Sequence, residues 1–135
     1  MVAQHPGEVQ PAVLAKYAQT FDAFSQGRLL FNVVNGNDQG LAALGIHYSH
    51  DERYDFSKEY WSTFQQNYLG DKSGFQGEFI QVAPRQEGAS PMSKWHGATQ
   101  KQGVPLWGAG TSAKGVQHSV ELLDVYLSFA NTPPL

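Results

Sequence analysis

Gly110, Thr111 and Ser112 form a turn between a short apolar stretch and a segment with helical periodicity. The first backbone N–H groups of a helix have no partner within the helix, and the helix dipole makes this end favour an anion. The hydroxyls of Thr111 and Ser112 would add two hydrogen-bond donors. This combination fits a phosphate group. The simpler interpretation is a helix cap without a ligand, and the local sequence alone favours it, because Thr and Ser often cap helices.

A second group of candidate residues surrounds the start of another predicted helix, near Ser49. His50 and Tyr54 are four residues apart, so they lie on one helix face, and Arg53 lies nearby. This helix start is a second candidate anion site, whereas in the simpler interpretation Tyr54 packs and His50 is solvated. The histidines show neither an H-E-x-x-H nor an H-x-H spacing, so no metal site is predicted.

Asn32 is a polar residue within the otherwise apolar segment 28–34. Its amide is either satisfied inside the core or reaches a ligand at the end of a strand, and the sequence leaves both readings open. The segment 108–115 contains G-x-G but lacks the third glycine of the dinucleotide-binding motif. A ligand with a single phosphate is therefore favoured over a dinucleotide.

Apolar periodicity and turn residues predict the elements that would position these side chains. Helices are predicted over residues 10–26, from near Ser49 to Gly70, and over residues 111–123. Strands are predicted over residues 28–34, 104–109 and 124–129, with a strand stub at Val2 and Ala3 and a hairpin over 75–82. The first helix would bury the apolar face formed by Val13, Leu14, Tyr17, Phe21 and Phe24. Residues 83–102 are polar and rich in Pro, Gly and Ser, which predicts a long surface loop.

The alternation of strands and helices predicts an α/β fold with a parallel sheet and right-handed crossovers. Segment 28–34 is apolar on both faces apart from Asn32, which predicts a strand covered on both sides. A (β/α)8 barrel uses roughly 31 residues per unit, so a chain of this length would make about four units. A doubly wound sheet of three or four strands also fits the length. In both folds the turns after the strands, including Asn131, would line one rim of the sheet.

The composition places the 135 residues in one globular domain, with 41% hydrophobic and 16% charged residues. The net charge is −3 without a basic stripe, so nucleic acid is not an expected partner. No apolar run approaches the roughly 20 residues that span a bilayer, so no membrane partner is expected. The chain has no cysteine and shows no secretory signal, which fits a cytoplasmic protein.

Taken together, the segments resemble the luciferase-like flavin-dependent monooxygenases, in particular the branch of the alkanesulfonate monooxygenases. The order and spacing of the matching motifs agree over nearly the whole chain, and residues 83–102 match least. The segments that carry the resemblance are HPGEVQPAVLAKYAQTFDAFSQGRLLFNVVNGND, SHDERYDFSKEY, F-x-GEF, PLWGAGTS and DVYLSF.

The resemblance implies a partial TIM barrel, with roughly the third to sixth strands and their helices and a small hairpin excursion. It implies a monooxygenase that uses FMN as FMNH₂, supplied by a separate NAD(P)H-dependent flavin reductase, together with O₂. The substrate would be a small organic molecule such as a sulfonate, alkane, sulfone or pyrimidine. Members of the family often form homo-oligomers.

The resemblance also assigns cofactor-binding positions. Asn32 would lie beside the flavin ring, and His50 and Tyr54 would contact the ribityl-phosphate end. The phosphate would be held by a turn that consists of Ala109, Gly110, Thr111 and Ser112. No catalytic base can be assigned in the chain.

Two alternatives to an enzyme remain open at this stage. One is a non-catalytic half barrel that at most binds FMN weakly or associates with another chain, because an open half barrel exposes unpaired edge strands. The other is a small flavodoxin-like domain with a phosphate ligand, which would be a stable monomer.

Overall fold

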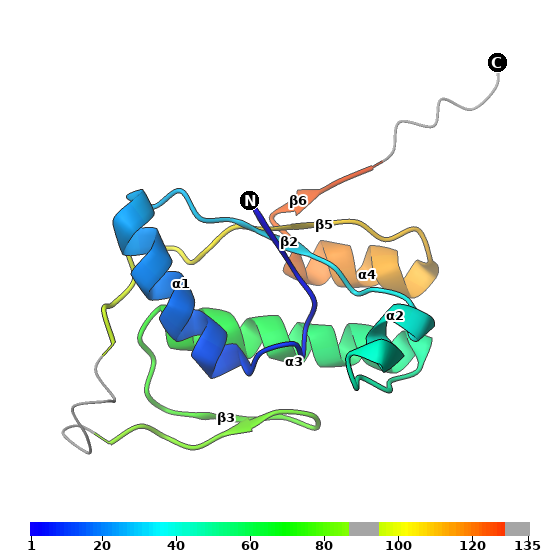
Figure 1. The fold of residues 1–135 in the computed structure, drawn as a ribbon, viewed down its shortest axis with the longest axis horizontal. Coiled ribbons are helices and arrows are strands. Elements are labelled where there is room, and N and C mark those ends of the chain that lie inside the picture. The colour runs from blue at the N-terminus through cyan, green and yellow to red at the C-terminus, as the bar shows by residue number, and fades with distance from the viewer. Residues whose placement is uncertain (87–94, 129–135) are drawn as a thin grey trace.

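Four parallel strands form the main sheet, in the order β1 (Val2–Gln4), β2 (Phe31–Val33), β5 (Leu106–Gly108) and β6 (Val125–Tyr126) (Figure 1). The structure is a computed structural model that describes residues 1–86 and 95–128. The predicted parallel α/β sheet and the strand stub at the start of the chain are confirmed.

Three helices connect the successive strands of this sheet and lie on the same side of it (Figure 1). They are α1 (Pro11–Ser25), α3 (His50–Tyr68) and α4 (Ala113–Leu122). Phe31 and Val33 of β2 are buried, whereas Asn32 between them is only half-buried. The prediction that this strand is covered on both sides is therefore wrong. Successive strand residues point to opposite faces, and the described helices cover only one of them.

The core lies between the sheet and α3. The ring of Phe31 contacts those of Trp61 and Phe64, with centroids 5.2 and 5.3 Å apart. At its start, α3 has a capping box: the Ser49 hydroxyl accepts a hydrogen bond from the Glu52 amide, and the Glu52 carboxylate accepts one from the Ser49 amide.

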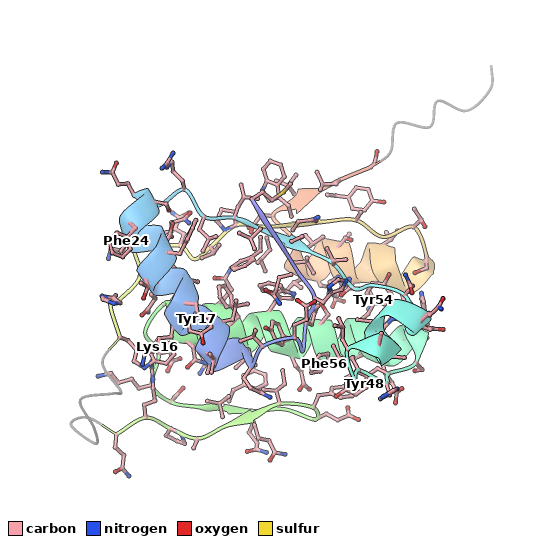
Figure 2. All side chains as sticks on the ribbon, in the orientation of Figure 1. Lys16, Tyr17, Phe24, Tyr48, Tyr54 and Phe56 are labelled. Carbon is pink, nitrogen blue, oxygen red and sulfur yellow. The ribbon has the colours of Figure 1, made fainter. Side chains whose placement is uncertain are left out.

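The buried face of α1 differs from the predicted one. Leu14 is buried as expected, but Val13, Tyr17, Phe21 and Phe24 are exposed, and Figure 2 labels Tyr17 and Phe24 on this helix. The side that packs against the sheet and α3 instead presents Pro11, Leu14, Ala15, Ala18, Gln19 and Asp22. Small alanines allow α1 to approach α3 closely, whereas a row of aromatic side chains would hold the two helices apart.

Two smaller elements flank α3 in the chain, a hairpin after it and a short helix before it. The predicted hairpin is confirmed as β3 (Phe75–Gln76) and β4 (Gln81–Val82), which pair antiparallel. Its turn is fixed by the Glu59 carboxylate, which accepts three backbone N–H bonds at 2.8, 2.9 and 3.1 Å. A short helix that the sequence did not indicate, α2 (Asp38–Ala43), precedes α3. The surface loop over 83–102 stays a prediction, because residues 87–94 lie outside the described residues.

Candidate functional site

The turn between β5 and α4 lies at the carboxyl end of β5, where parallel sheets place their ligands. Ser112 is the N-cap of α4, and its hydroxyl accepts a hydrogen bond from the Gly115 amide at 3.0 Å. The Ser112 hydroxyl therefore caps the helix, as the interpretation without a ligand predicts. Ala109 and Thr111 are exposed. The Thr111 hydroxyl is a donor at the open end of the helix, in addition to the first amide groups.

Two glycines bring this turn against the first turn of α4. A Cβ on Gly110 would lie 2.9 Å from the Gly115 Cα, and one on Gly115 would lie 3.1 Å from the Gly110 Cα. Such distances leave no room for a side chain at either position, so the backbones touch directly. The space beside each glycine is thus filled by the backbone of the other, which packs the turn tightly against the start of α4.

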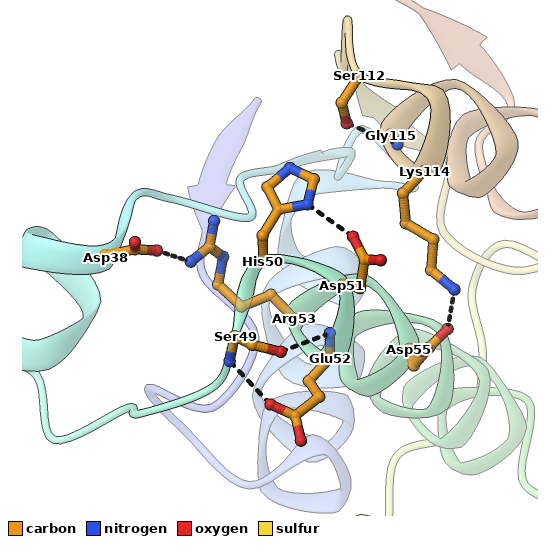
Figure 3. A network of polar contacts seen from close by, with 10 residues as sticks. All are labelled: Asp38, Ser49, His50, Asp51, Glu52, Arg53, Asp55, Ser112, Lys114 and Gly115. Atoms are coloured by element: carbon orange, nitrogen blue, oxygen red, sulfur yellow. Dashed lines mark hydrogen bonds and ion pairs between the residues drawn. The ribbon is translucent and has the colours of Figure 1, made fainter.

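Tyr54 of α3 reaches the same place. Its hydroxyl would be 2.9 Å from a Cβ on Gly115. Its ring lies between two histidines, with centroid distances of 5.2 Å to His50 and 5.2 Å to His118, both in edge-to-face geometry. Figure 3 shows the starts of α3 and α4 side by side. The structure thus brings His50, Tyr54 and the 110–112 turn together, although they are far apart in the sequence.

An ion pair links the starts of α3 and α4. Lys114 Nζ of α4 lies 2.7 Å from Asp55 Oδ1 of α3, and this hydrogen bond raises the pKa of Lys114 (Figure 3). His50 Nδ1 lies 2.8 Å from Asp51 Oδ1. Lys114 is charged at neutral pH, and the Asp55 carboxylate balances this charge beside the turn.

His118 was not identified from the sequence, because a histidine in the middle of a short helix carries no local signal. It is buried, and its Nε2 lies 3.0 Å from the Ser57 hydroxyl. Burial lowers the pKa of His118 to about 4, so the ring is neutral at pH 7. It therefore supports Tyr54 by packing and adds no charge to the site.

We expect the pKa of His118 to make folding stability depend on pH. The unfolded chain, with the ordinary value of 6.5, binds a proton more readily than the folded chain. Stability is therefore highest above pH 6.5 and falls as the pH drops toward 4, by roughly 3 kcal/mol in total. Urea unfolding between pH 7 and 4.5 measures this slope. A His118→Asn variant should flatten it, and an unchanged slope would contradict the assignment.

Arg53 is a second residue whose role the sequence did not define. It is buried, and its Nη1 pairs with the Asp38 carboxylate at the start of α2 (Figure 3). Its Nε has no hydrogen-bond partner within residues 1–86 and 95–128, and the same holds for the buried Oδ1 of Asn35. The Arg53 Nε at the start of α3 is thus an unsatisfied donor, and the Asn35 Oδ1 after β2 is an unsatisfied acceptor. A polar ligand could pair with either atom.

Asn32 lies apart from the phosphate-like turn. It is paired in register with Ala3 on one side and Trp107 on the other, on the sheet face that the described helices leave uncovered. Along the neighbouring strand, Ala109 is two residues beyond Trp107, a rise of roughly 7 Å. Asn32 and the turn are thus close enough to contact different parts of one extended ligand. Asn131 lies outside the described residues.

The described part of the chain contains no group of three or more His, Cys, Asp or Glu side chains that could hold a metal ion. None of its helices is both long enough and apolar enough to cross a bilayer.

Comparison with known proteins gives a family match and a set of similar folds. The sequence model of a family described as luciferase-like monooxygenase matches residues 1–135, the whole chain. EDTA monooxygenase EmoA from Chelativorans sp. BNC1 is similar in structure, with 19% identity and a TM-score of 0.75, over 96% of this chain and 33% of that protein.

Two other solved structures are similar to this chain at comparable identity and over a comparable share of their length. Monooxygenase RslO1 from Streptomyces bottropensis has 19% identity and a TM-score of 0.72, over 97% of this chain and 38% of that protein. The oxygenating constituent of 3,6-diketocamphane monooxygenase from the CAM plasmid of Pseudomonas putida, solved with FMN, has 16% identity and a TM-score of 0.66, over 82% and 32%. At these identities the likeness shows the fold, part of a TIM barrel. The chain spans about a third of the length of these proteins.

Proposed function

The chain belongs to the luciferase-like monooxygenase family, and we propose on this basis that it forms the phosphate-binding side of the FMN site of an O₂-dependent monooxygenase. The observation that carries this proposal is the meeting of Tyr54 with the glycine-lined turn at the start of α4. The Tyr54 hydroxyl of α3 and the first amides of α4 are donors from two helices that lie together there.

The residues of this site fit a phosphate monoester. A phosphate dianion would accept hydrogen bonds from the first amides of α4 and from the hydroxyls of Thr111 and Tyr54. Gly110 and Gly115 hold the turn directly against the first turn of α4, since a Cβ on either would force the two backbones apart.

FMN bound in its reduced form would supply the electrons that activate O₂ for oxidation of an organic substrate. The residues of this chain would bind and orient it. Thr111 and the amides of α4 would hold the phosphate, and Tyr54, fixed between His50 and His118, would orient the ribityl-phosphate end. Asn32, on the uncovered sheet face, would present its amide to the flavin ring.

The remaining parts of the proposal concern partners. We propose that a separate NAD(P)H-dependent reductase supplies the reduced flavin, in the cytoplasm, where NAD(P)H is available. The substrate would be a small organic molecule, with an alkanesulfonate as the first candidate. Similar proteins are named for substrates as different as EDTA and 3,6-diketocamphane, which supports a broad substrate class.

A second candidate function is a half barrel that binds FMN weakly and has no activity of its own. The described helices leave the sheet face of Asn32 and Trp107 uncovered, and both residues are only half-buried. This favours the second candidate, because an active site there would be open to water on one side. Sulfite release from an alkanesulfonate, coupled to a flavin reductase, separates the two candidates, since only a monooxygenase turns over.

We expect a Thr111→Val substitution to weaken FMN binding by roughly 10- to 100-fold, the effect of losing one hydrogen bond to a charged group. The change keeps the shape of the side chain and leaves the Ser112 cap intact. Titration followed by flavin fluorescence measures the dissociation constant. Thr20→Val is the matched control, because the Thr20 hydroxyl bonds only to the Lys16 carbonyl of α1 in the described structure. Equal affinities for Thr111→Val and the unchanged chain would remove Thr111 from the phosphate site.

A further inference from the structure

The turn that follows β1 places a carboxylate against a histidine. It has the sequence His5-Pro6-Gly7-Glu8, and the Glu8 amide donates to the His5 carbonyl at 3.4 Å. Pro6 suits the second position of a type II turn, and Gly7, with a φ of +95°, suits the third. Because the turn brings its first and fourth residues together, the Glu8 side chain lies beside the His5 ring.

The Glu8 carboxylate fixes one side of this ring. Its Oε1 lies 3.0 Å from His5 Nδ1, and its Oε2 accepts a hydrogen bond from the Gln4 side-chain amide at 2.7 Å. An ionised carboxylate can only accept hydrogen bonds, so the neutral His5 ring carries its proton on Nδ1. The Nε2 of His5 is therefore a free proton acceptor.

The other side of the ring lies against the backbone that follows β2. A Cβ on Gly36 would be 3.2 Å from His5 Cδ2, so the ring packs on that turn. The His5 side chain is 33% exposed, and no hydrogen bond within residues 1–86 and 95–128 uses its Nε2. The imidazole is thus held in one orientation, with its acceptor atom available to a ligand.

His5 lies at the same end of the sheet as the candidate site. It directly follows β1, where the Val34 amide donates to the Gln4 carbonyl at 3.1 Å. Asn32 of β2 is paired in register with Ala3, and His5 is two residues beyond Ala3. The Cα atoms of Asn32 and His5 are therefore about 8 Å apart. A flavin ring beside Asn32 would lie within reach of the His5 imidazole.

We propose that His5 is the proton-transfer residue at the flavin-ring end of this site and that Glu8 is its positioning residue. The inference rests on the proposed function, which assigns no residue to this role. A base held by an orienting carboxylate is the arrangement that proton transfer requires. His50 is also bonded to a carboxylate, that of Asp51 at 2.8 Å, but its ring meets Tyr54 at the phosphate end.

The proposed proton transfer balances. Monooxygenation puts one oxygen atom of O₂ into the substrate and releases the other as water, with two electrons and two protons from reduced FMN. His5 would accept one of these protons at Nε2, and the Glu8 carboxylate would stabilise the imidazolium that forms. The Nε2–H would then donate this proton to the oxygen atom that leaves, as its bond to the transferred oxygen breaks. The ring thereby returns to its neutral form.

Contact between His5 and FMN is tested by acylation of the 135-residue chain with diethyl pyrocarbonate, which attacks unprotonated imidazole nitrogens. Mass spectrometry of peptides gives the rate for each histidine. At FMN ten times its dissociation constant, acylation of His5 should slow by about 10-fold, the factor set by occupancy of the site. His47, an exposed residue between α2 and α3, is the internal control and should react at an unchanged rate.

The role of Glu8 is tested by NMR of the ring nitrogens, which distinguishes the two neutral forms of a histidine. The unchanged chain should carry the His5 proton on Nδ1. In Glu8→Gln the new amide keeps its oxygen toward the Gln4 donor and turns its NH₂ group toward His5 Nδ1. The proton should therefore move to Nε2, and acylation at that atom should be lost. Asp51→Asn, beside His50, is the matched control and should leave the form of His5 unchanged.

The contrary results separate this inference from the proposed function. If FMN binds and Thr111→Val weakens its binding, but His5 reacts equally fast with and without FMN, the proton-transfer role is wrong and the phosphate site stands. A proton on Nε2 of His5 in the unchanged chain would also overturn the role. No binding of FMN at any concentration would contradict the proposed function and this inference together. The protection by FMN is measured on the unchanged chain and needs no variant.

Discussion

A Gly115→Ala substitution is expected to weaken FMN binding by roughly 10- to 100-fold, an effect of about 1.4–2.8 kcal/mol. The added methyl group would lie 2.9 Å from the Tyr54 hydroxyl and 3.1 Å from both the Gly110 Cα and the Ser112 Oγ. Tyr54 and the turn would have to move apart, and the surface proposed to bind the phosphate would be lost. The dissociation constant is measured by titration calorimetry.

Gly40→Ala is a closely matched control for this variant. Gly40 and Gly115 both lie three residues after a helix N-cap, and each donates its amide to the capping side chain, Asn37 or Ser112. A Cβ on Gly40 would be no closer than 3.4 Å to any neighbour, an ordinary contact. We expect Gly40→Ala to add up to about 1 kcal/mol of stability and to leave FMN binding unchanged. Equal affinities of the two variants for FMN would contradict the proposed role of residues 110–115 in phosphate binding.

An Asp22→Asn substitution is expected to destabilise the fold by about 3 kcal/mol or more, a large part of the 5–15 kcal/mol that is typical of a domain. Asp22 of α1 is fully buried. Its carboxylate accepts hydrogen bonds from the Tyr68 hydroxyl at 2.6 Å, the Gln100 amide at 2.8 Å and the Leu29 backbone amide at 3.0 Å. An asparagine would turn an NH₂ group toward at least one of these donors, so buried donors would lose their acceptor. Urea denaturation measures the loss.

The same network predicts a second pH dependence. Burial raises the pKa of the Asp22 carboxyl, but the bonds from Tyr68, Gln100, Leu29 and Ser25 together outweigh it and lower the pKa below 3.8. Burial and the bond to Asp22 raise the pKa of Tyr68 to about 12, so its hydroxyl remains a donor. The stability that Asp22 contributes is therefore present above about pH 4 and lost as the pH falls through its lowered pKa.

The stability lost when Asp22 is protonated is separate from the stability lost when His118 is protonated, which occurs between pH 6.5 and 4. Below pH 4 the stability of Asp22→Asn should fall less steeply than that of the unchanged chain. Glu78→Gln removes an exposed carboxylate in the hairpin turn and serves as the control, with little change expected. A loss under 1 kcal/mol for Asp22→Asn would show that the network contributes little.

Much of the fold was predictable because its signals are local. The periodicity of α1 and α3, the capping box at Ser49 and Glu52, and the turn before α4 are properties of contiguous segments. The alternation of strands and helices then restricts the topology to parallel strands with right-handed crossovers. The sequence also identified the 110–112 turn and the Tyr54 helix face as candidate anion sites, because helix starts and hydroxyl residues are visible without a fold.

The tertiary structure decided what depends on partners distant in the sequence. Helix α1 has two sides that could pack, one rich in alanine and one rich in aromatic residues, and only its fit against α3 selects the alanine side. The contact of Tyr54 with Gly115, the support by His118 and the burial of Asp22 join residues dozens of positions apart. Sequence by itself therefore determined the elements and their order. Which faces are buried, and which polar groups meet, depended on how closely those elements approach, a property of side-chain volume in three dimensions.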